Sequence, residues 1–383
     1  MPHYNDLRPT ADFERRDYAL VFPNMQPSDK ARALHSLLRL KAGLTDSIPH
    51  RKSESNLLIA SWNIKEFGHT TQRLPEAFFY IAETLSHFDL IALQEVKSSL
   101  KHLNKVMRIL GSDWDYIVND ITDGKNGNSE SSAYLYNTKR VGLSGLAGEI
   151  VIWDELIEDV FAEQDPDSRE KHLRQLKRTP YVTGFKAGWK SFALVNVHLH
   201  PGDDDDDVAL RRDEVSLLLA ALQRKRAELW NKNLVLTGDF NFYKLRDATT
   251  VARIHAAGFN EVDGLLGKPT NASGSQTYDR FFINAGEYFK LVRDAAEHTV
   301  GGVFNPFSHV YRDDDWAAYR AEMLDDYTGS KDLENDEAAL QAYYRNTWRR
   351  NQLSDHLPIW FELQIDSSTD FLAEKAASVA DDR

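Results

Sequence analysis

The sequence predicts a mixed fold of the α/β or α+β class. Short apolar runs that end in polar residues recur from Asn56 onward, and amphipathic stretches alternate with them. The hydrophobic share of 42% is enough to form a sizeable core. No repeat at a fixed period is visible, which excludes solenoids and propellers. We therefore expect one large catalytic domain with short extensions.

The elements can be assigned in chain order. Residues 1–55 are polar apart from a helical pattern that ends near Gly43, so we interpret them as a partly helical N-terminal extension outside the core. The predicted strands are Leu57–Ala60, Leu90–Leu93, Tyr134–Tyr136, Phe192–Val197, Leu234–Leu236, Phe281–Ile283 and Ile359–Leu363. The predicted helices between them are Pro75–Leu85, Leu100–Leu110, Val208–Trp230 and Ala248–Ala257. Residues 56–365 form the predicted catalytic domain.

Two late segments differ from this pattern. Residues 303–350 are charged and helical without a strand signal, so we predict an insertion before the last strand, and residues 366–383 form a polar tail. Within the insertion, Tyr343–Arg350 mixes aromatic and basic residues. This pattern fits a surface that contacts single-stranded nucleic acid, and it fits equally an amphipathic helix that packs its aromatic side chains. The run Asp203–Asp207 fits a helix N-terminus better than a weak calcium loop.

Composition excludes several kinds of site. The chain contains no cysteine, so it has no disulfide, thiolate metal site or cysteine nucleophile, and a metal must bind to oxygen or imidazole. No apolar stretch is long enough to span a bilayer and no signal sequence is visible, so we expect a cytoplasmic protein without a membrane partner. The net charge of −13 argues against a non-specific nucleic-acid coat but allows a local basic face.

Chemically useful side chains follow or precede the predicted strands. They are Asn63, Glu95, His198, Asp239 and Asn241 after strands, and Asp279, Asp355 and His356 before strands. Carboxylate and amide oxygens suit a hard cation such as Mg²⁺ or Mn²⁺, and a zinc motif of the HExxH type is absent. A cation, carboxylates and two histidines can together activate water for phosphodiester hydrolysis. Singly, each of these residues also has a purely structural interpretation.

Taken in order, these motifs resemble the endonuclease/exonuclease/phosphatase superfamily, and within it DNase I. The matching segments are Ile59–Gly68, Asp89–Val96, Gly238–Asn241 and Tyr278–Arg280, and the resemblance spans about residues 56 to 363. It implies a four-layer sandwich in which two mostly antiparallel sheets pack face to face with helices outside.

The resemblance also implies roles for individual residues. Asn63, Glu95 and Asp355 would form the metal site. Asp239 and Asn241 would position the water and the phosphate.

Two carboxylate–histidine pairs are implied as well, Glu130 with His198 and Asp279 with His356. In each pair the acid would fix the imidazole tautomer and support its charge. Which histidine is the base stays open.

The substrate side of the resemblance is less complete. Arg178 and Lys65 fall where the family places phosphate-contacting cations. Three positions depart from the family pattern, with Ser131 and Lys97 in place of arginines and Asn128 in place of a stacking tyrosine. Minor-groove recognition of duplex DNA is therefore in doubt.

The sequence thus predicts a Mg²⁺- or Mn²⁺-dependent endonuclease that hydrolyses DNA or another nucleic acid. Two alternatives are open. One is a phosphatase or phosphodiesterase of a small phosphorylated molecule or lipid on the same fold, and the other is a catalytically silent binding module. The expected partner is a nucleic acid substrate, and the sequence is silent on protein partners.

Overall fold

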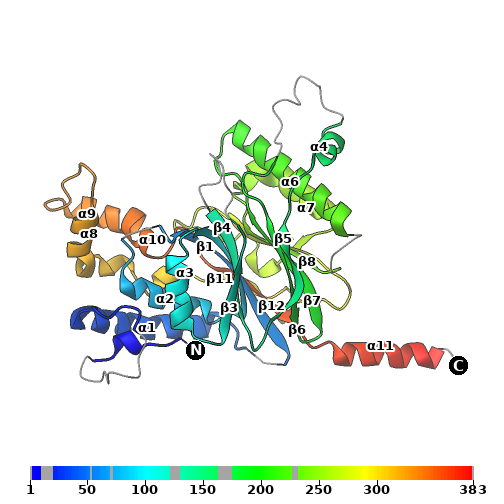
Figure 1. Ribbon diagram of the computed structural model, residues 1–383, viewed down its shortest axis with the longest axis horizontal. Helices are drawn as coiled ribbons and strands as arrows, with labels where there is room; N and C mark the ends of the chain where they lie inside the picture. Colours follow the sequence, from blue (N-terminus) through cyan, green and yellow to red (C-terminus); the bar gives the residue numbers. More distant parts are fainter. Residues whose placement is uncertain are drawn as a thin grey trace.

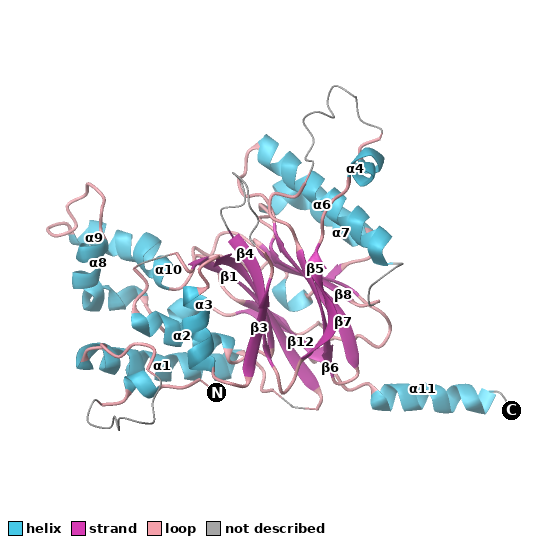
Figure 2. Ribbon diagram, viewed as in Figure 1, coloured by secondary structure: helices cyan, strands magenta, loops and turns pink. Residues whose placement is uncertain are grey.

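The chain folds into a two-sheet sandwich with helices on both outer faces (Figures 1 and 2). The computed structural model describes residues 2–9, 20–51, 54–69, 72–120, 130–162, 175–226 and 232–381. The layers follow the order helices, sheet, sheet, helices, so the predicted four-layer architecture is confirmed.

Each sheet contains six strands. The first has the spatial order β11 (Gly301–Val303), β12 (Ile359–Gln364), β1 (Asn56–Phe67), β2 (Leu90–Lys97), β4 (Glu130–Asn137) and β3 (Trp114–Val118). The second has the order β5 (Gly142–Glu149), β6 (Tyr181–Ala187), β7 (Lys190–His198), β8 (Leu234–Asp239), β10 (Asp279–Asn284) and β9 (Asn260–Glu261). The pairs β1–β2 and β7–β8 are parallel and the others are antiparallel, so the sheets are mostly antiparallel as predicted.

Alternation along the strands builds the separate core layers. In β1, Leu57 and Ile59 point into the cluster between the two sheets, whereas Leu58 and Ala60 point to the cluster beneath the outer helices. All four side chains are fully buried. Because both faces of β1 are buried, its sequence is a continuous apolar run instead of an apolar–polar alternation.

Helices cover both outer faces. On the first sheet lie α1 (Pro27–Ser47), α2 (Pro75–Leu85) and α3 (Lys101–Leu110), and on the second lie α6 (Asp205–Arg226) and α7 (Ala248–Ala256), with the short α4 (Asp154–Val160) packed on α6. The first turn of α6 is Asp205–Asp207, so these acids lie at the positive end of its dipole. In the described ranges, no helix has the length and apolar character needed to cross a bilayer.

The N-terminal helix corrects one expectation. Leu37, Leu40 and Leu44 of α1 are buried in the same hydrophobic cluster as β1 and α2, so this helix is part of the core and does not lie outside it. An amphipathic helix must bury its apolar stripe, and here α2 supplies the surface. The predicted domain boundaries remain a prediction.

The segment before β12 is helical, as its sequence suggested. It contains α8 (Arg320–Asp326), α9 (Glu337–Tyr343), a π-helical turn (Tyr344–Trp348) and α10 (Arg349–Gln352). Tyr344 and Trp348 are fully buried against Tyr311 and Tyr319. These two rings therefore act as packing aromatics rather than as an exposed stacking surface.

The last helix, α11 (Ser368–Asp381), lies in the predicted polar tail and projects away from the sandwich (Figure 1). Near its start, Phe371 packs on Trp189 and Tyr288, and Asp370 pairs with Lys290. Leu372 and Val379 are 64% and 62% exposed, so the apolar side of the helix is largely uncovered within the described chain.

We predict that a buried histidine in α3 weakens the fold in mild acid. Burial, and then the neighbouring Arg73 cation, lower the pKa of His102 to about 3. The unfolded chain takes up this proton near pH 6.5 and the folded chain does not. Stability is therefore complete above about pH 6.5 and falls as the pH drops toward 3, by at most about 1.4 kcal/mol per pH unit for one proton.

Urea unfolding of the wild type and of His102→Asn at pH 7.5 and pH 5.0 tests this. Asparagine keeps an acceptor for Arg73, which donates to His102 Nδ1 at 3.0 Å, but it does not titrate. We expect the free energy of unfolding to fall less in the variant than in the wild type. Equal falls would mean that folded His102 titrates at its ordinary pKa.

Candidate active site

The predicted site residues meet at one edge of the sandwich. β1, β2, β7 and β8 end at this edge, whereas β4 and β10 begin there. In the strand registers Asp239 lies opposite both His198 and Asp279, and Glu130 lies opposite Lys97. Side chains that are far apart in the sequence are therefore brought together by strand pairing.

A buried polar network ties the two sheets together beneath this edge. The Gln94 amide donates to Asn196 Oδ1 at 2.7 Å and to Ser61 Oγ at 3.1 Å, and Asn196 Nδ2 donates to the Leu93 carbonyl at 2.9 Å. All three side chains are fully buried, so losing one partner would leave an unsatisfied polar group. The network fixes the spacing between the two halves of the site.

The backbone is bent where the site side chains leave the strands. Glu95 and Asn241 have left-handed φ angles of 59° and 50°, and β2 carries a bulge between Leu93 and Val96. Gly238 has φ 130°, and a Cβ there would lie 2.0 Å from the Val197 carbonyl oxygen. Only glycine allows β8 to approach β7 this closely immediately before Asp239.

Asp239 lies at the centre of the site. Its Oδ2 atom accepts a hydrogen bond from Asn63 Nδ2 at 3.1 Å and lies 3.6 Å from His198 Nε2 and 3.5 Å from His356 Nε2. Its Oδ1 atom accepts from the Asn241 N–H at 2.9 Å. Burial raises the pKa of Asp239 to about 6. One carboxylate therefore faces two imidazoles and one amide.

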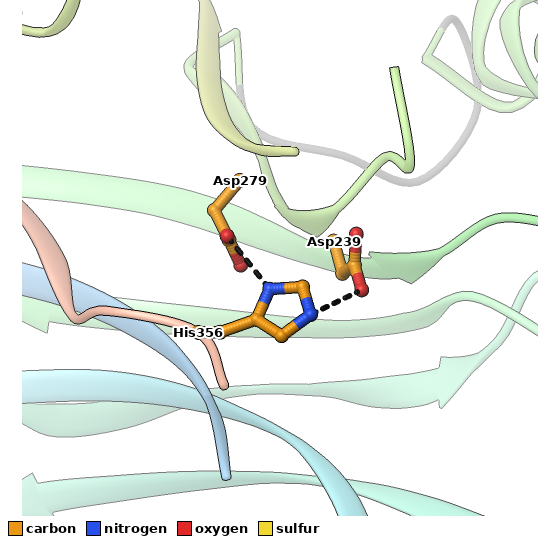
Figure 3. Close-up of side chains that lie close together, drawn as sticks. All are labelled: Asp239, Asp279 and His356. Carbon is orange, nitrogen blue, oxygen red and sulfur yellow. Dashed lines mark hydrogen bonds and ion pairs between the residues drawn. The ribbon is translucent and has the colours of Figure 1, made fainter. Parts of the chain in front are cut away.

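One histidine is held in its charged form. His356 Nδ1 lies 2.9 Å from Asp279 Oδ2, and the opposite ring nitrogen points to Asp239 (Figure 3). Although burial opposes a charge, the two carboxylates raise the pKa of His356 well above its ordinary value. At neutral pH this imidazolium can donate a proton.

The other histidine is held in its neutral form. Burial and the charge of Arg178 lower the pKa of His198 well below its ordinary value. Its Nδ1 lies 3.5 Å from Glu130 Oε2, but that carboxylate is already paired with Arg178 at 2.9 Å and with Lys97 at 3.2 Å. Two cations thus offset the charge that was expected to support a protonated His198.

Glu95 and Asn63 offer oxygen ligands for a divalent cation. Glu95 Oε1 accepts from Asn63 Nδ2 at 3.0 Å, and its Oε2 accepts from the Glu66 N–H at 2.9 Å. Asn63 Oδ1 is buried and has no hydrogen-bond partner in the described part of the chain, which is costly unless a ligand satisfies it. These two residues therefore fit a hard cation.

A second set of ligand atoms lies beside the first. Asp239, Asp279 and His356 each present one atom within 4.8 Å of the others, a geometry that can also hold a metal ion. The hydrogen bond between His356 Nδ1 and Asp279 favours a proton-transfer pair over a metal cluster at this position.

The remaining predicted site residues that the structure describes contact neighbouring groups at the same edge. Lys65 Nζ lies 3.7 Å from Asp355 Oδ2, the half-exposed carboxylate that the resemblance places in the metal site. Arg178 contacts Glu130, and Asn241 Nδ2 donates to the Leu199 carbonyl at 3.0 Å. Asn128 lies outside the described residues.

The sequence analysis missed a role for Ser354. Its buried hydroxyl donates to the Asn63 carbonyl at 2.6 Å and accepts from the N–H groups of Lys65 and His356 at 3.1 Å. It therefore ties the end of β1 to the loop that carries His356. The one signal in the sequence was its place directly before the candidate residues Asp355 and His356.

The chain is similar in sequence to two deoxyribonucleases. No family model matches the chain. Human deoxyribonuclease-1 is 27% identical over 217 residues, which are 55% of this chain and 67% of that protein. Rat deoxyribonuclease gamma is 23% identical over 197 residues, which are 49% of this chain and 56% of that protein. These alignments leave a third or more of each relative unmatched.

Both relatives are deoxyribonucleases. This chain has the two-sheet sandwich that was predicted from the DNase I resemblance. The chain has the DNase I-like fold of the endonuclease/exonuclease/phosphatase superfamily. The structure of an endonuclease/exonuclease/phosphatase from Bacteroides vulgatus aligns with 82% of this DNase I-like chain and 100% of its own, at a TM-score of 0.47 and 14% identity. The similarity to deoxyribonucleases supports a nuclease or phosphodiesterase of this superfamily.

Proposed function

We propose that this DNase I-like protein is a divalent-metal-dependent endonuclease that hydrolyses phosphodiester bonds in DNA. The observation that carries the proposal is the position of Asp239 between one charged and one neutral imidazole, beside the Glu95–Asn63 pair. Phosphodiester hydrolysis needs a group that takes a proton from water and a group that gives one to the leaving oxygen. The two histidines are in opposite protonation states, as that division of work requires.

The pKa directions assign the two roles. His356 is protonated at neutral pH, because Asp279 and Asp239 raise its pKa, so it donates a proton to the leaving oxygen. His198 is neutral, because burial and Arg178 lower its pKa, so it accepts a proton from the attacking water. Asp239 contacts both rings and keeps them aligned with each other.

Glu95 and Asn63 would hold the Mg²⁺ or Mn²⁺ ion. The chemistry that a metal ion held by these residues would supply is relief of negative charge on the phosphoryl oxygens. The buried and unpartnered Asn63 Oδ1 supports this position. Asp355 carries the third predicted ligand, and its pairing with Lys65 keeps both groups at the same edge.

DNA is the proposed substrate because the proteins that the chain resembles in sequence are deoxyribonucleases. Lys65 is the partly exposed cation that we propose for phosphate contact. Arg178 is 12% exposed and bound to Glu130, so we propose that it acts mainly by setting the charge around His198.

The test is incubation of the purified protein with supercoiled plasmid in Mg²⁺, in Mn²⁺ and in EDTA. We expect nicked and linear products with either metal, none in EDTA, and strongly reduced cleavage with Glu95→Gln. Intact plasmid in every metal would reject duplex DNA as the substrate. Parallel reactions with single-stranded DNA, RNA and p-nitrophenyl phosphate would then distinguish another nuclease from a small-molecule phosphatase.

A further inference from the structure

A buried arginine lies behind the active site and has no acidic partner among the described residues. Arg73 is 6% exposed, and no carboxylate of the described chain lies within ion-pair distance of its guanidinium group. Burial lowers the pKa of Arg73 to about 10, so it still carries its charge at neutral pH. A buried cation without a counter-ion is costly, and it persists only where several hydrogen bonds satisfy it.

Those hydrogen bonds reach two separate segments. Arg73 Nη2 donates to the carbonyls of Lys65 at 3.0 Å and Leu353 at 3.1 Å, and Nε donates to the Gln352 carbonyl at 2.9 Å. A further hydrogen bond joins Nη1 to His102 Nδ1 at 3.0 Å, and the guanidinium also lies over the Phe67 ring, 5.5 Å from its centroid. The planar guanidinium therefore joins the end of β1 to the end of α10.

A second residue ties the same two regions together. Gln352 is fully buried, accepts from the Leu74 N–H at 2.7 Å and donates to the Gln72 carbonyl at 2.8 Å. The segment around Arg73 and the end of α10 are thus cross-linked by reciprocal side-chain hydrogen bonds. These hydrogen bonds hold the end of the helical segment 303–352 in place. The loop that carries Asp355 and His356 begins immediately after it.

Both tied segments carry site residues. Lys65 follows Asn63 by two positions on β1, and Leu353 precedes Asp355 by two positions. We propose that Arg73 is a positioning residue. Its hydrogen bonds to three backbone carbonyls, those of Lys65, Gln352 and Leu353, set the distance between the end of β1 and the loop that carries Asp355 and His356. The expected effect of Arg73 on catalysis rests on the proposed function, whereas its effect on the position of the two segments can be measured without substrate.

The experiment compares Arg73→Lys with the wild type. Lysine keeps the charge but lacks the planar fork, so one ammonium cannot reproduce three carbonyl contacts and the histidine contact. Arg140→Lys is the matched control, because Arg140 is also mostly buried and bonds the Asn56 carbonyl at the opposite end of β1. Gln352→Met is a second, milder variant that removes only the cross-link to residues 72 and 74.

Three measurements are made on each protein. Amide hydrogen exchange reports opening of the peptides that cover residues 62–67 and 352–357, where the Lys65 and His356 N–H groups both bond to Ser354. Titration calorimetry with Mn²⁺ alone reports the metal site, and steady-state cleavage separates kcat from KM.

For Arg73→Lys we expect faster exchange confined to these two peptides, Mn²⁺ binding weaker by about 10- to 100-fold, and a similar loss in kcat with little change in KM. Gln352→Met should show the same pattern to a smaller extent, and Arg140→Lys should show neither change. Unchanged exchange in both peptides, or equal changes in Arg140→Lys, would overturn the proposal. If the wild type neither binds Mn²⁺ nor cleaves DNA, the proposed function fails, whereas the exchange data still decide whether Arg73 holds the two segments.

Discussion

Replacement of His356 by alanine is expected to lower kcat for plasmid cleavage by about 10²- to 10⁴-fold, because the variant lacks the group proposed to protonate the leaving oxygen. His356 is the histidine whose pKa is raised by Asp279 and Asp239, so it carries the proton at neutral pH. Its loss should change KM far less than kcat, since proton donation acts mainly in the transition state. Single-turnover cleavage at saturating protein measures the effect.

The choice of leaving group sharpens this test. On a thymidine p-nitrophenyl phosphodiester, the leaving phenolate needs little protonation, so the loss in His356→Ala should be much smaller than on DNA. His255→Ala, which changes a half-exposed histidine on α7, is the control and should retain the wild-type rate on both substrates. Equal losses on the two substrates would show that His356 does not act as the general acid.

Replacement of Glu95 by glutamine is expected to weaken Mn²⁺ binding by more than about 100-fold, because even outer-shell changes commonly cost about 10- to 100-fold in metal affinity. Glutamine keeps the size of the side chain and an oxygen but removes the negative charge that a hard cation needs. Cleavage at a fixed, moderate Mn²⁺ concentration should fall accordingly. Titration calorimetry with Mn²⁺ measures the binding directly.

The neighbouring Glu66→Gln is the matched control for this change. Glu66 lies near the end of β1, and its backbone N–H donates to Glu95 on the neighbouring β2, but its own side chain is exposed. It loses the same charge without losing a proposed ligand, so its Mn²⁺ affinity should stay within a few-fold of the wild type. If Glu95→Gln binds Mn²⁺ as tightly as Glu66→Gln does, the metal lies instead on the neighbouring set Asp239, Asp279 and His356.

Most of the strands that were predicted are buried on both faces, although the buried β6 was not predicted. The β1, β2, β7, β8 and β12 sequences are apolar runs because both of their faces are covered, and such runs are visible in a single sequence. In contrast, β5 (Gly142–Glu149) is half-exposed and contains three glycines, so it carries no strand signal of its own. It forms as a strand because its backbone pairs with the edge of β6.

One interpretation that was open in the sequence and one prediction that was wrong both depended on packing. The Tyr343–Arg350 pattern was compatible with both an exposed platform and a buried stripe, and only the contacts of Tyr344 and Trp348 with Tyr311 and Tyr319 distinguish them. The helical pattern that ends near Gly43 did not indicate which surface covers its apolar face. Only the structure shows that α1 packs on α2. A periodicity identifies an apolar face but not the surface that covers it.

By itself, the sequence determined the alternation of strands and helices, the residue types available for chemistry and the DNase I-like motifs at the strand ends. These depend on local order along the chain, which is present in any single sequence. Only the tertiary structure decided that Asp239 faces both imidazoles, that Lys97 and Arg178 share Glu130, and that Arg73 joins two distant segments. The physical reason is that protonation and positioning depend on charges and carbonyls within a few ångströms, and those neighbours are set by strand register and loop packing rather than by chain order.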